Sequence, residues 1–480
     1  MINLIKNELK KIFSKKAIYI VLIITIGFCI LSNIMQKRAR ETVYSYMNYN
    51  YEPEEDIVIY EDNLEIAKEN GDTEGIIILE TKIEKIKIME NYDKRSWQQN
   101  FGEQLENTIE SIKRATNEAD KEKYQKEYDE LVKNFKEDNW RACAERELEK
   151  INKEITEITD KEERLSKEDE KKVLEWRIEK NISYATSDLN TYLNTWRSER
   201  MNKRYTEKET YSNPADKEEQ LQQYNATIEI CEYAIENDLN TNISKQVRSS
   251  QGIISTTAKS QFLEVFDSYG FFIILTVVII AGTIVSEEFN KGTIKLLLVR
   301  PYKRTKILLA KFITCLIILL GSYITLALTQ TIVGGIVYGF NSYSDPTIMY
   351  NFTTNSIEHV GNIQYVIMSG LAILPQYLLL MALAFAIGTI ATNSPIAIAI
   401  PCIGTFISEI INELAYHFEK ARFLIYFVTP NWDLSIYAFG KKPLLPELSL
   451  PFSIIICAIY FAILLWASIM VFKRRDIKNI

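Results

Sequence analysis

The stretch that decides the fold of this chain runs from Glu287 to Lys311 and reads EEFNKGTIKLLLVRPYKRTKILLAK. It carries seven lysine or arginine residues and lies between two long apolar runs, 269–286 and 307–337. A bilayer crossing takes about 20 apolar residues, so each run is long enough to span a membrane. Because positive loops are retained in the cytoplasm, the stretch predicts a short cytoplasmic segment between two transmembrane helices.

The charge is distributed unevenly between an acidic central block and the basic remainder of the chain. Residues 41–260 hold 33 Lys or Arg and 50 Asp or Glu, a net charge of −17. The remainder holds 23 and 13, a net charge of +10. The mean hydropathy of −0.09 therefore averages an acidic polar block with a basic, strongly apolar frame, and each needs its own class assignment.

Six apolar runs predict six transmembrane helices and an all-α membrane protein. The expected spans are 17–35, 269–286, 307–337, 363–391, 395–411 and 451–472. The third run is too long for one perpendicular crossing, which predicts a tilt or an end lying in the interface. The other expected segments are an amphipathic interfacial helix (1–16), an outer helical domain (36–268), a coupling segment (287–306), an outer loop (338–362), a re-entrant or outer segment (412–450) and a tail (473–480).

Lysine and arginine cluster before the first span, after the second and after the sixth. With an even number of spans these clusters share one side, so both termini are predicted to be cytoplasmic and residues 36–268 extracellular. Four cations between 412 and 450 fit this orientation less well. The composition, rich in Ile, Lys and Asn, suits the plasma membrane of an AT-rich bacterium. A cleaved signal peptide is the alternative for the first run, but that run is long and no small-residue cleavage site follows it.

The outer domain is predicted to contain several antiparallel helices, as a bundle or a coiled-coil-like stalk. Between Pro53 and Pro214 there is no proline and glycine is rare, and apolar residues recur three and four apart. Thr159 followed by Glu162 has the spacing of a capping box.

Two kinds of side chain in the outer domain have both a structural and a functional interpretation. Cys143 and Cys231 could form one disulfide or remain free thiols. Four tryptophans could bind a ligand or fill helix cores. They are Trp97, Trp140, Trp176 and Trp196.

The sequence lacks the motifs of a self-contained enzyme. There is no GxxxxGK[ST] phosphate loop and no HExxH, CxxC or GxSxG motif. The two histidines, His359 and His417, lie far apart in the sequence. We therefore expect neither catalysis nor a metal or cofactor site in this chain.

Around the quoted stretch, distinctive residues follow one another in a recognisable order. A basic amphipathic stretch precedes the first span, and an acidic pair, a Gly-Thr step, an apolar segment ending in Arg-Pro and a basic turn follow the second. The residues concerned are Glu287, Glu288, Gly292, Thr293, Arg300, Pro301, Arg304 and Lys311. This order resembles that of the ABC-2 type permeases, the membrane subunits of ATP-driven transporters. The resemblance covers about the first 40 residues and the chain from about 265 onward, but not the outer domain.

The resemblance implies a permease that works as a dimer, identical or paired with a related chain, with ABC ATP-binding subunits. Those partners would bind ATP and Mg²⁺, so no cofactor is expected here. Membrane lipids are expected partners and nucleic acid is not. The resemblance also implies export of amphipathic or antimicrobial peptides, drugs or lipid-like molecules, and the large outer domain would suit a role in self-immunity.

The residues of the coupling segment have a physical interpretation of their own. Gly292 permits a turn where the span ends, Thr293 could cap a short helix, and Pro301 would stop it. A short rigid helix at the membrane surface could sit in a groove of a soluble partner and transmit its movement. The alternative is a snorkelling basic loop that only fixes the topology.

Polar side chains inside the spans are costly in lipid, which makes Gln330, Gln376 and Asn393 candidates for a translocation path. Hydrogen bonding between helices is the equal alternative. For the whole chain, the alternative to an exporter is a receptor or sensor whose outer domain binds a ligand or a wall component. A membrane-embedded enzyme is a third interpretation, but no catalytic constellation supports it.

Overall fold

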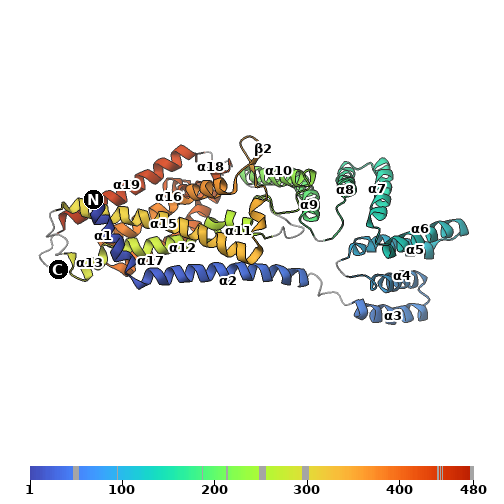
Figure 1. Cartoon of the computed structure of the whole chain (residues 1–480). Coiled ribbons are helices and arrows are strands. Elements are labelled where there is room, and N and C mark those ends of the chain that lie inside the picture. Colours follow the sequence, from blue (N-terminus) through green and yellow to red (C-terminus); the bar gives the residue numbers. More distant parts are fainter. Residues whose placement is uncertain are drawn as a thin grey trace.

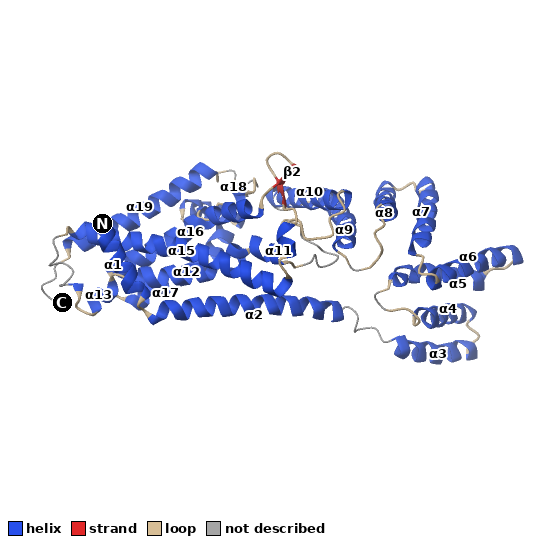
Figure 2. Ribbon diagram, viewed as in Figure 1, coloured by secondary structure: helices blue, strands red, loops and turns tan. Residues whose placement is uncertain are grey.

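The structure, a computed structural model, describes residues 1–46, 53–93, 96–185, 187–211, 214–247, 256–294, 302–440, 443, 445 and 447–475. The described chain is almost entirely helical, and six of its helices are long and apolar enough to cross a membrane (Figure 1, Figure 2). They are α2 (Lys16–Tyr46), α12 (Val265–Thr283), α15 (Arg304–Tyr338), α16 (Asn362–Ile390), α17 (Ser394–His417) and α19 (Leu450–Arg474). The prediction of an all-α membrane protein with six transmembrane helices is confirmed.

The third apolar run forms one continuous helix. At about 1.5 Å per residue, the 35 residues of α15 extend for about 52 Å, which exceeds the apolar thickness of about 30 Å. The helix ends at Gly339, whose φ of 91° lies in the region that favours glycine. Helix α15 is therefore long enough for both of its ends to reach the polar zones of a bilayer.

The core of the membrane part lies around α12. This helix packs against α16, α15 and α17, and its inward face is buried at Ile273, Val277, Val278 and Ala281. Helices α2, α17 and α19 lie at the periphery and expose most of their apolar side chains. The bundle is thus built on α12, α15 and α16, whose apolar residues point in nearly all directions.

Helices α12 and α16 cross at a pair of glycines. A Cβ added to Gly388 would lie 2.6 Å from the carbonyl oxygen of Gly282, and a Cβ on Gly282 would lie 3.1 Å from the Cβ of Ala397. Close backbone contact through small residues is a common way of packing helices in lipid.

Adding a methyl group at this crossing should destabilise the bundle. We expect Gly388→Ala to lower the free energy of unfolding by about 1–3 kcal/mol, because a backbone atom cannot move aside as a flexible side chain can. Gly404→Ala in α17 is the matched control, since nothing lies within 4 Å of its added Cβ. Thermal unfolding in detergent measures both. Equal stability of the two variants would contradict the close crossing.

The outer domain consists of helical hairpins that follow one another along the chain. The pairs α3–α4, α5–α6, α7–α8 and α9–α10 pack side by side, and successive pairs touch (Figure 1). Their bounds are α3 (Pro53–Glu69), α4 (Thr73–Met89), α5 (Gly102–Arg114), α6 (Glu118–Lys136), α7 (Trp140–Glu157), α8 (Lys161–Glu179), α9 (Asp188–Lys208) and α10 (Pro214–Glu236). A short 3-10 helix, η1 (Trp97–Phe101), precedes α5.

The two cysteines of the outer domain are buried in different cores and are not bonded to one another. Cys143 lies in a core that includes Trp97, and Cys231 in one that includes Trp176 and Trp196. Burial raises the pKa of the Cys143 thiol to about 12, so it remains protonated at neutral pH. These three tryptophans fill cores, and Trp140 packs at the edge of the core of Trp97 and of a small core around Ile151.

The capping prediction at Thr159 is wrong by one residue. The side chain of Asp160 accepts hydrogen bonds from the backbone N–H groups of Glu162 and Glu163, and α8 begins after it. An aspartate satisfies the free N–H groups of a first turn at least as well as a threonine does.

The segment between the third and fourth spans is more than a loop. It contains the antiparallel strands β1 (Ile348–Asn351) and β2 (Ser356–His359), with Ile348 opposite His359. The N–H of Ile348 donates to the carbonyl oxygen of Ile243, 2.9 Å away. Ile348 and Tyr350 are buried in the core that holds Trp196. This hairpin therefore joins the outer domain to the membrane part.

The segment before the last span consists of short elements. They are η3 (Glu419–Tyr426), η4 (Thr429–Asn431) and α18 (Ser435–Ala438). Asn431 is fully buried, and its side chain donates to the carbonyl oxygens of Ile425 and Phe427. The segment between α17 and α19 therefore has a defined local structure.

A buried lysine lies where the outer domain meets the bundle. Lys259, on α11 (Ala258–Leu263), is fully buried, and its Nζ donates to the carbonyl oxygen of Pro346 at 2.8 Å. Burial lowers the pKa of Lys259 to about 8, against the opposing effect of Asp345.

This lowered pKa predicts a pH-dependent stability. Between about pH 8 and about 10.4 the unfolded chain holds a proton on Lys259 that the folded chain lacks, so the free energy of unfolding should rise with pH by up to about 3 kcal/mol. Lys259→Met should lose this rise, whereas Lys121→Met on the exposed face of α6 should keep it. Unfolding temperatures from pH 7 to pH 10 measure it, and parallel profiles for wild type and Lys259→Met would contradict it.

Candidate functional site

The acidic pair of the coupling segment lies directly at the end of the second span. Helix α12 ends at Thr283, and the short helix α13 (Ser286–Asn290) carries both glutamates in its first turn. The hydroxyl of Ser286 donates to the carbonyl oxygen of Gly282 at 2.6 Å and shares a 2.7 Å hydrogen bond with Ser394 at the start of α17. Helix α13 is therefore held close to two spans.

Gly292 ends α13 with a φ of 67°, as expected for a turn at this position. The hydroxyl of Thr293 donates to the carbonyl oxygen of Glu288 at 3.4 Å. Arg300 and Pro301 lie outside the described residues, and so does most of the short helix that Thr293 was expected to cap.

The amphipathic helix at the start of the chain, α1 (Ile2–Phe13), packs against α15. Leu4 and Ile12 are buried, and Leu9 packs on the core of the bundle. Phe13, the last residue of the helix, is half exposed. Glu8 lies on the inward face between Leu4 and Ile12 and is 6% exposed.

A network of charges, buried except at Lys11, joins these elements. Lys311 Nζ, on α15, lies 2.9 Å from Glu8 Oε2 and 2.9 Å from Glu288 Oε1, and it also donates to the carbonyl oxygen of Ile284 at 3.1 Å. Lys11 Nζ lies 2.8 Å from the same Glu288 oxygen and 3.7 Å from Glu8 Oε1. We call Glu8, Lys11, Glu288 and Lys311 the ion network. It fastens α1 and α13 to α15.

The electrostatics of the ion network follow from its burial. The side chains of Lys311, Glu8 and Glu288 are 1%, 8% and 10% exposed. Removing charges from water is costly, and they remain charged only when oppositely charged partners and hydrogen bonds replace the water. Glu288 Oε2 is buried without a hydrogen-bond partner among the described residues. Two carboxylates and two ammonium groups balance each other, so the network is neutral.

Glu287 lies at the edge of this arrangement. Its carboxylate pairs with Lys15 at 2.9 Å and with Lys291 at 3.1 Å, and its side chain is 29% exposed. The two glutamates of the predicted coupling segment thus have different environments: Glu288 is structural, whereas Glu287 faces the surface.

Arg304 lies apart from the ion network. Its guanidinium donates to the carbonyl oxygens of Lys473 and Arg475 at the end of α19. Arg475 in turn donates to the carbonyl oxygens at the end of α16 and lies over the ring of Phe289, 4.9 Å from its centroid. Helix α13 is therefore also linked to the ends of α16 and α19.

The three residues predicted for a translocation path lie in three different environments. Gln330 is fully buried and forms a reciprocal pair of 3.2 Å amide hydrogen bonds with Asn33 of α2. Asn393 is exposed and caps α17. Gln376 is half-buried in α16. The structure does not bring them together, and a path through them remains a prediction.

Sequence reasoning missed Glu8, although a signal was present. Positions 4, 8 and 12 are one helical turn apart, so an acid at position 8 falls on the same face as Leu4 and Ile12. A carboxylate on an apolar face indicates a buried cation opposite. Among the described residues, no group of three or more His, Cys, Asp or Glu side chains could hold a metal ion.

Comparison with known proteins identifies relatives of this chain. Residues 242–478 match a family described as "Protein of unknown function (DUF2705)". The chain is 30% identical to the uncharacterized protein YhcI of Bacillus subtilis over 262 residues, 53% of this chain and 77% of YhcI. It is 27% identical to the uncharacterized membrane protein YdbK of the same organism over 207 residues, 42% of this chain and 76% of YdbK. No solved structure matches the chain. Glu288 and Lys311 lie inside the family region, whereas Glu8 and α3 to α10 lie outside it.

Proposed function

The chain belongs to the same family as YhcI of Bacillus subtilis, and we propose that this multi-pass membrane protein is the permease subunit of an ATP-driven exporter. The ATPase would be a separate polypeptide, as in the ABC-2 type permeases that the sequence resembles. A second copy or a related permease would complete the membrane part. The observation that carries the proposal is the buried ion network, which makes α13 a rigid extension of the bundle.

Rigidity matters because a coupling element has to pass a displacement on to the spans. Helix α13 continues from α12 and is fixed to α1 and α15 through Glu288 and Lys311. Arg475 links it to the ends of α16 and α19. A push on α13 from a soluble partner would therefore move the core spans instead of being absorbed by a loose loop.

The proposed orientation puts α1, α13 and the end of α19 in the cytoplasm and the outer domain outside the cell. Cations are concentrated at that end of the bundle, before α2, around the start of α15 and at the end of α19. Lys and Arg are retained on the cytoplasmic side during insertion, which supports this assignment. In this orientation, Glu287 would face an ATPase below the membrane.

The proposed cargo is an amphiphile: an amphipathic or antimicrobial peptide, a drug or a lipid-like molecule. The class rests on the resemblance to the permeases. Self-immunity is the corresponding proposed role. Deletion of the outer domain would then change sensitivity to membrane-active peptides, and unchanged sensitivity to all of them would contradict that role.

Purification from the native membrane tests the proposal directly. We expect a stoichiometric ATP-binding cassette protein with vanadate-sensitive ATPase activity to co-purify with the chain. A folded preparation without any ATPase would contradict the exporter and favour the alternative, a receptor whose outer domain binds a ligand.

Glu287, the glutamate outside the ion network, offers a sharper test of the interface. Glu287→Lys should leave the bundle folded, because the ion network does not include it, but it should reduce the co-purifying ATPase by about tenfold, equivalent to about 1.4 kcal/mol of binding free energy. Glu65→Lys, the same charge reversal on an exposed position of α3, is the matched control. Equal recovery of ATPase with both variants would show that α13 does not contact it.

A further inference from the structure

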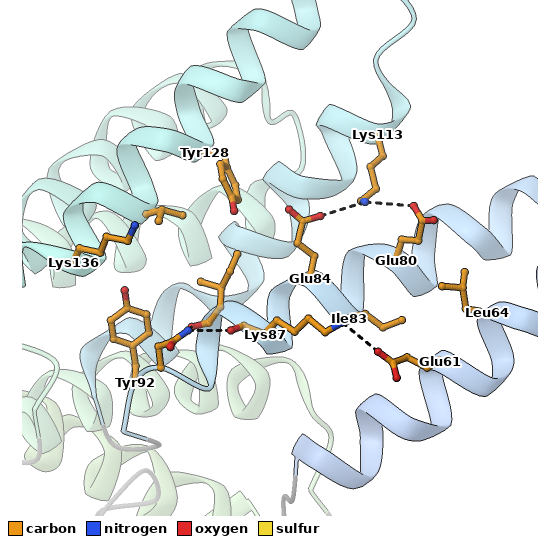
Figure 3. A pocket seen from close by; sticks show the side chains of 13 residues that line it. Glu61, Leu64, Glu80, Ile83, Glu84, Lys87, Tyr92, Lys113, Tyr128 and Lys136 are labelled. Atoms are coloured by element: carbon orange, nitrogen blue, oxygen red, sulfur yellow. Dashed lines mark hydrogen bonds and ion pairs between the residues drawn. The ribbon is translucent and has the colours of Figure 1, made fainter.

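The outer domain contains a cavity of about 810 Å³ between the α3–α4 and α5–α6 hairpins (Figure 3). Its size falls in the range of about 300–1,000 Å³ that is usual for ligand sites. The cavity lies outside the family region 242–478 and far along the chain from the ion network.

The cavity can take apolar groups. Leu64, Ile88 and Val132 are only half buried there, so their apolar surface remains available to a ligand. Tyr92 and Tyr128 stand at the wall, and no hydrogen bond to a described residue engages either phenol (Figure 3). Apolar surface with a few free polar groups is the usual composition of a ligand site.

The charges are unevenly distributed along the cavity. At one end Lys113 lies 3.5 Å from Glu80 and 3.2 Å from Glu84, so two carboxylates share one ammonium group. Beside them Glu61 and Lys87 form a 3.2 Å pair and balance each other. This end therefore has a surplus of one negative charge.

The opposite end has a surplus of one positive charge. Lys136 lies there beside Tyr92, away from Glu80 and Glu61 (Figure 3). Its side chain is exposed and has no ion pair with a described residue.

Burial and the nearby carboxylate of Glu84 raise the pKa of Tyr128, which keeps its hydroxyl protonated and able to donate.

We propose that this cavity binds a short peptide with free termini and apolar side chains. The amino terminus would pair with Glu80 and Glu84, the carboxyl terminus with Lys136, and the phenols would bond to the peptide backbone between them. A zwitterionic lipid headgroup fits less well, because its two charges are close together and would not reach both ends. A divalent cation also fits less well, because each carboxylate already pairs with a lysine and only one negative charge is in excess.

Binding to the full-length chain in lipid nanodiscs tests this inference. The probe is an equimolar pool of pentapeptides with free termini and apolar central residues, compared with the same pool acetylated and amidated. Calorimetry should detect binding of the free pool, and the capped pool should bind about tenfold or more weakly, because it loses both terminal charges. The comparison leaves the protein unchanged, so misfolding cannot explain a difference.

Three variants locate the binding. Lys136→Gln and the double change Glu80→Gln with Glu84→Gln should each weaken binding by about 5-fold, the upper range for exposed ion pairs. Tyr128→Phe should weaken it as well through loss of one hydroxyl. Lys126→Gln, on the same helix but outside the cavity, should not.

Three results would overturn the inference: no binding of the free pool, equal binding of the capped pool, or full binding by the Lys136→Gln variant. The assay needs no ATPase, so its failure would leave the exporter proposal intact. Its success would likewise not depend on transport.

Discussion

Replacing Lys311 with methionine should lower the free energy of unfolding by about 3–5 kcal/mol, the usual cost of removing one partner from a buried ion pair. The ammonium group of Lys311 lies 2.9 Å from both Glu8 and Glu288, and all three side chains are at least nine-tenths buried. Without it, two carboxylates would face each other with only Lys11 nearby. We expect the variant to unfold at a lower temperature in detergent and to accumulate poorly in the membrane.

A second change should relieve part of this loss. In the double variant Lys311→Met with Glu288→Met, Glu8 keeps Lys11 at 3.7 Å and no second buried carboxylate remains. Replacing a buried pair by apolar side chains of similar size is often close to neutral. Lys306→Met, at an exposed position near the start of α15, should change stability by less than about 0.5 kcal/mol. If Lys311→Met were as stable as Lys306→Met, the ion network would not exist as described.

Replacing Trp196 with alanine should cost about 3–5 kcal/mol and should loosen the outer domain where it joins the bundle. Trp196 is 3% exposed, its ring meets that of Trp176 edge-on at 4.9 Å, and its indole N–H donates to Glu232 at 2.8 Å. The same core holds Ile348 of the β-hairpin. Limited proteolysis of the full-length chain should therefore cut the outer domain much faster in the variant.

One further substitution separates packing from hydrogen bonding at this site, and a second serves as a control. Trp196→Phe keeps an aromatic ring but loses the N–H, so its cost should be clearly smaller than that of alanine. Tyr205→Ala lies on the same helix at a position that is 63% exposed and should change stability by less than about 0.5 kcal/mol. Equal proteolysis of the Trp196→Ala and Tyr205→Ala variants would contradict a core at this junction.

The parts of the fold that depend on local patterns could be predicted from the sequence. Transmembrane helices follow from runs of about 20 apolar residues, so all six were found, including the 35-residue α15. The outer helices followed from the spacing of apolar residues and the absence of proline. The start of α8 was missed by one residue because Thr159 and Asp160 are both good caps and only the three-dimensional structure distinguishes them.

The parts that depend on distant contacts could not be predicted with the same success. Each strand of the β-hairpin is four residues long. The hairpin is stabilised by packing against Ile243 and the core of α9 and α10, and no local sequence pattern predicts this contact. The pairing of Glu8 with Lys311 joins residues 303 positions apart. For the same reason the sequence analysis grouped Arg304 with the acidic pair, although in the structure its guanidinium donates to a backbone carbonyl oxygen at the end of α19.

The amide pair between Asn33 and Gln330 has a consequence for how the chain is made. Its two residues are 297 positions apart, and they join α2, which has few other buried contacts, to α15. At about 5–20 residues per second, the ribosome reaches Gln330 about 15–60 seconds after Asn33. For that interval α2 lacks the Gln330 partner of Asn33, whose amide can still donate to the carbonyl oxygen of Cys29 in its own helix, while the outer hairpins are already being synthesised. The contact between α2 and α15 therefore forms only after the third span has been made, although α2 is synthesised first.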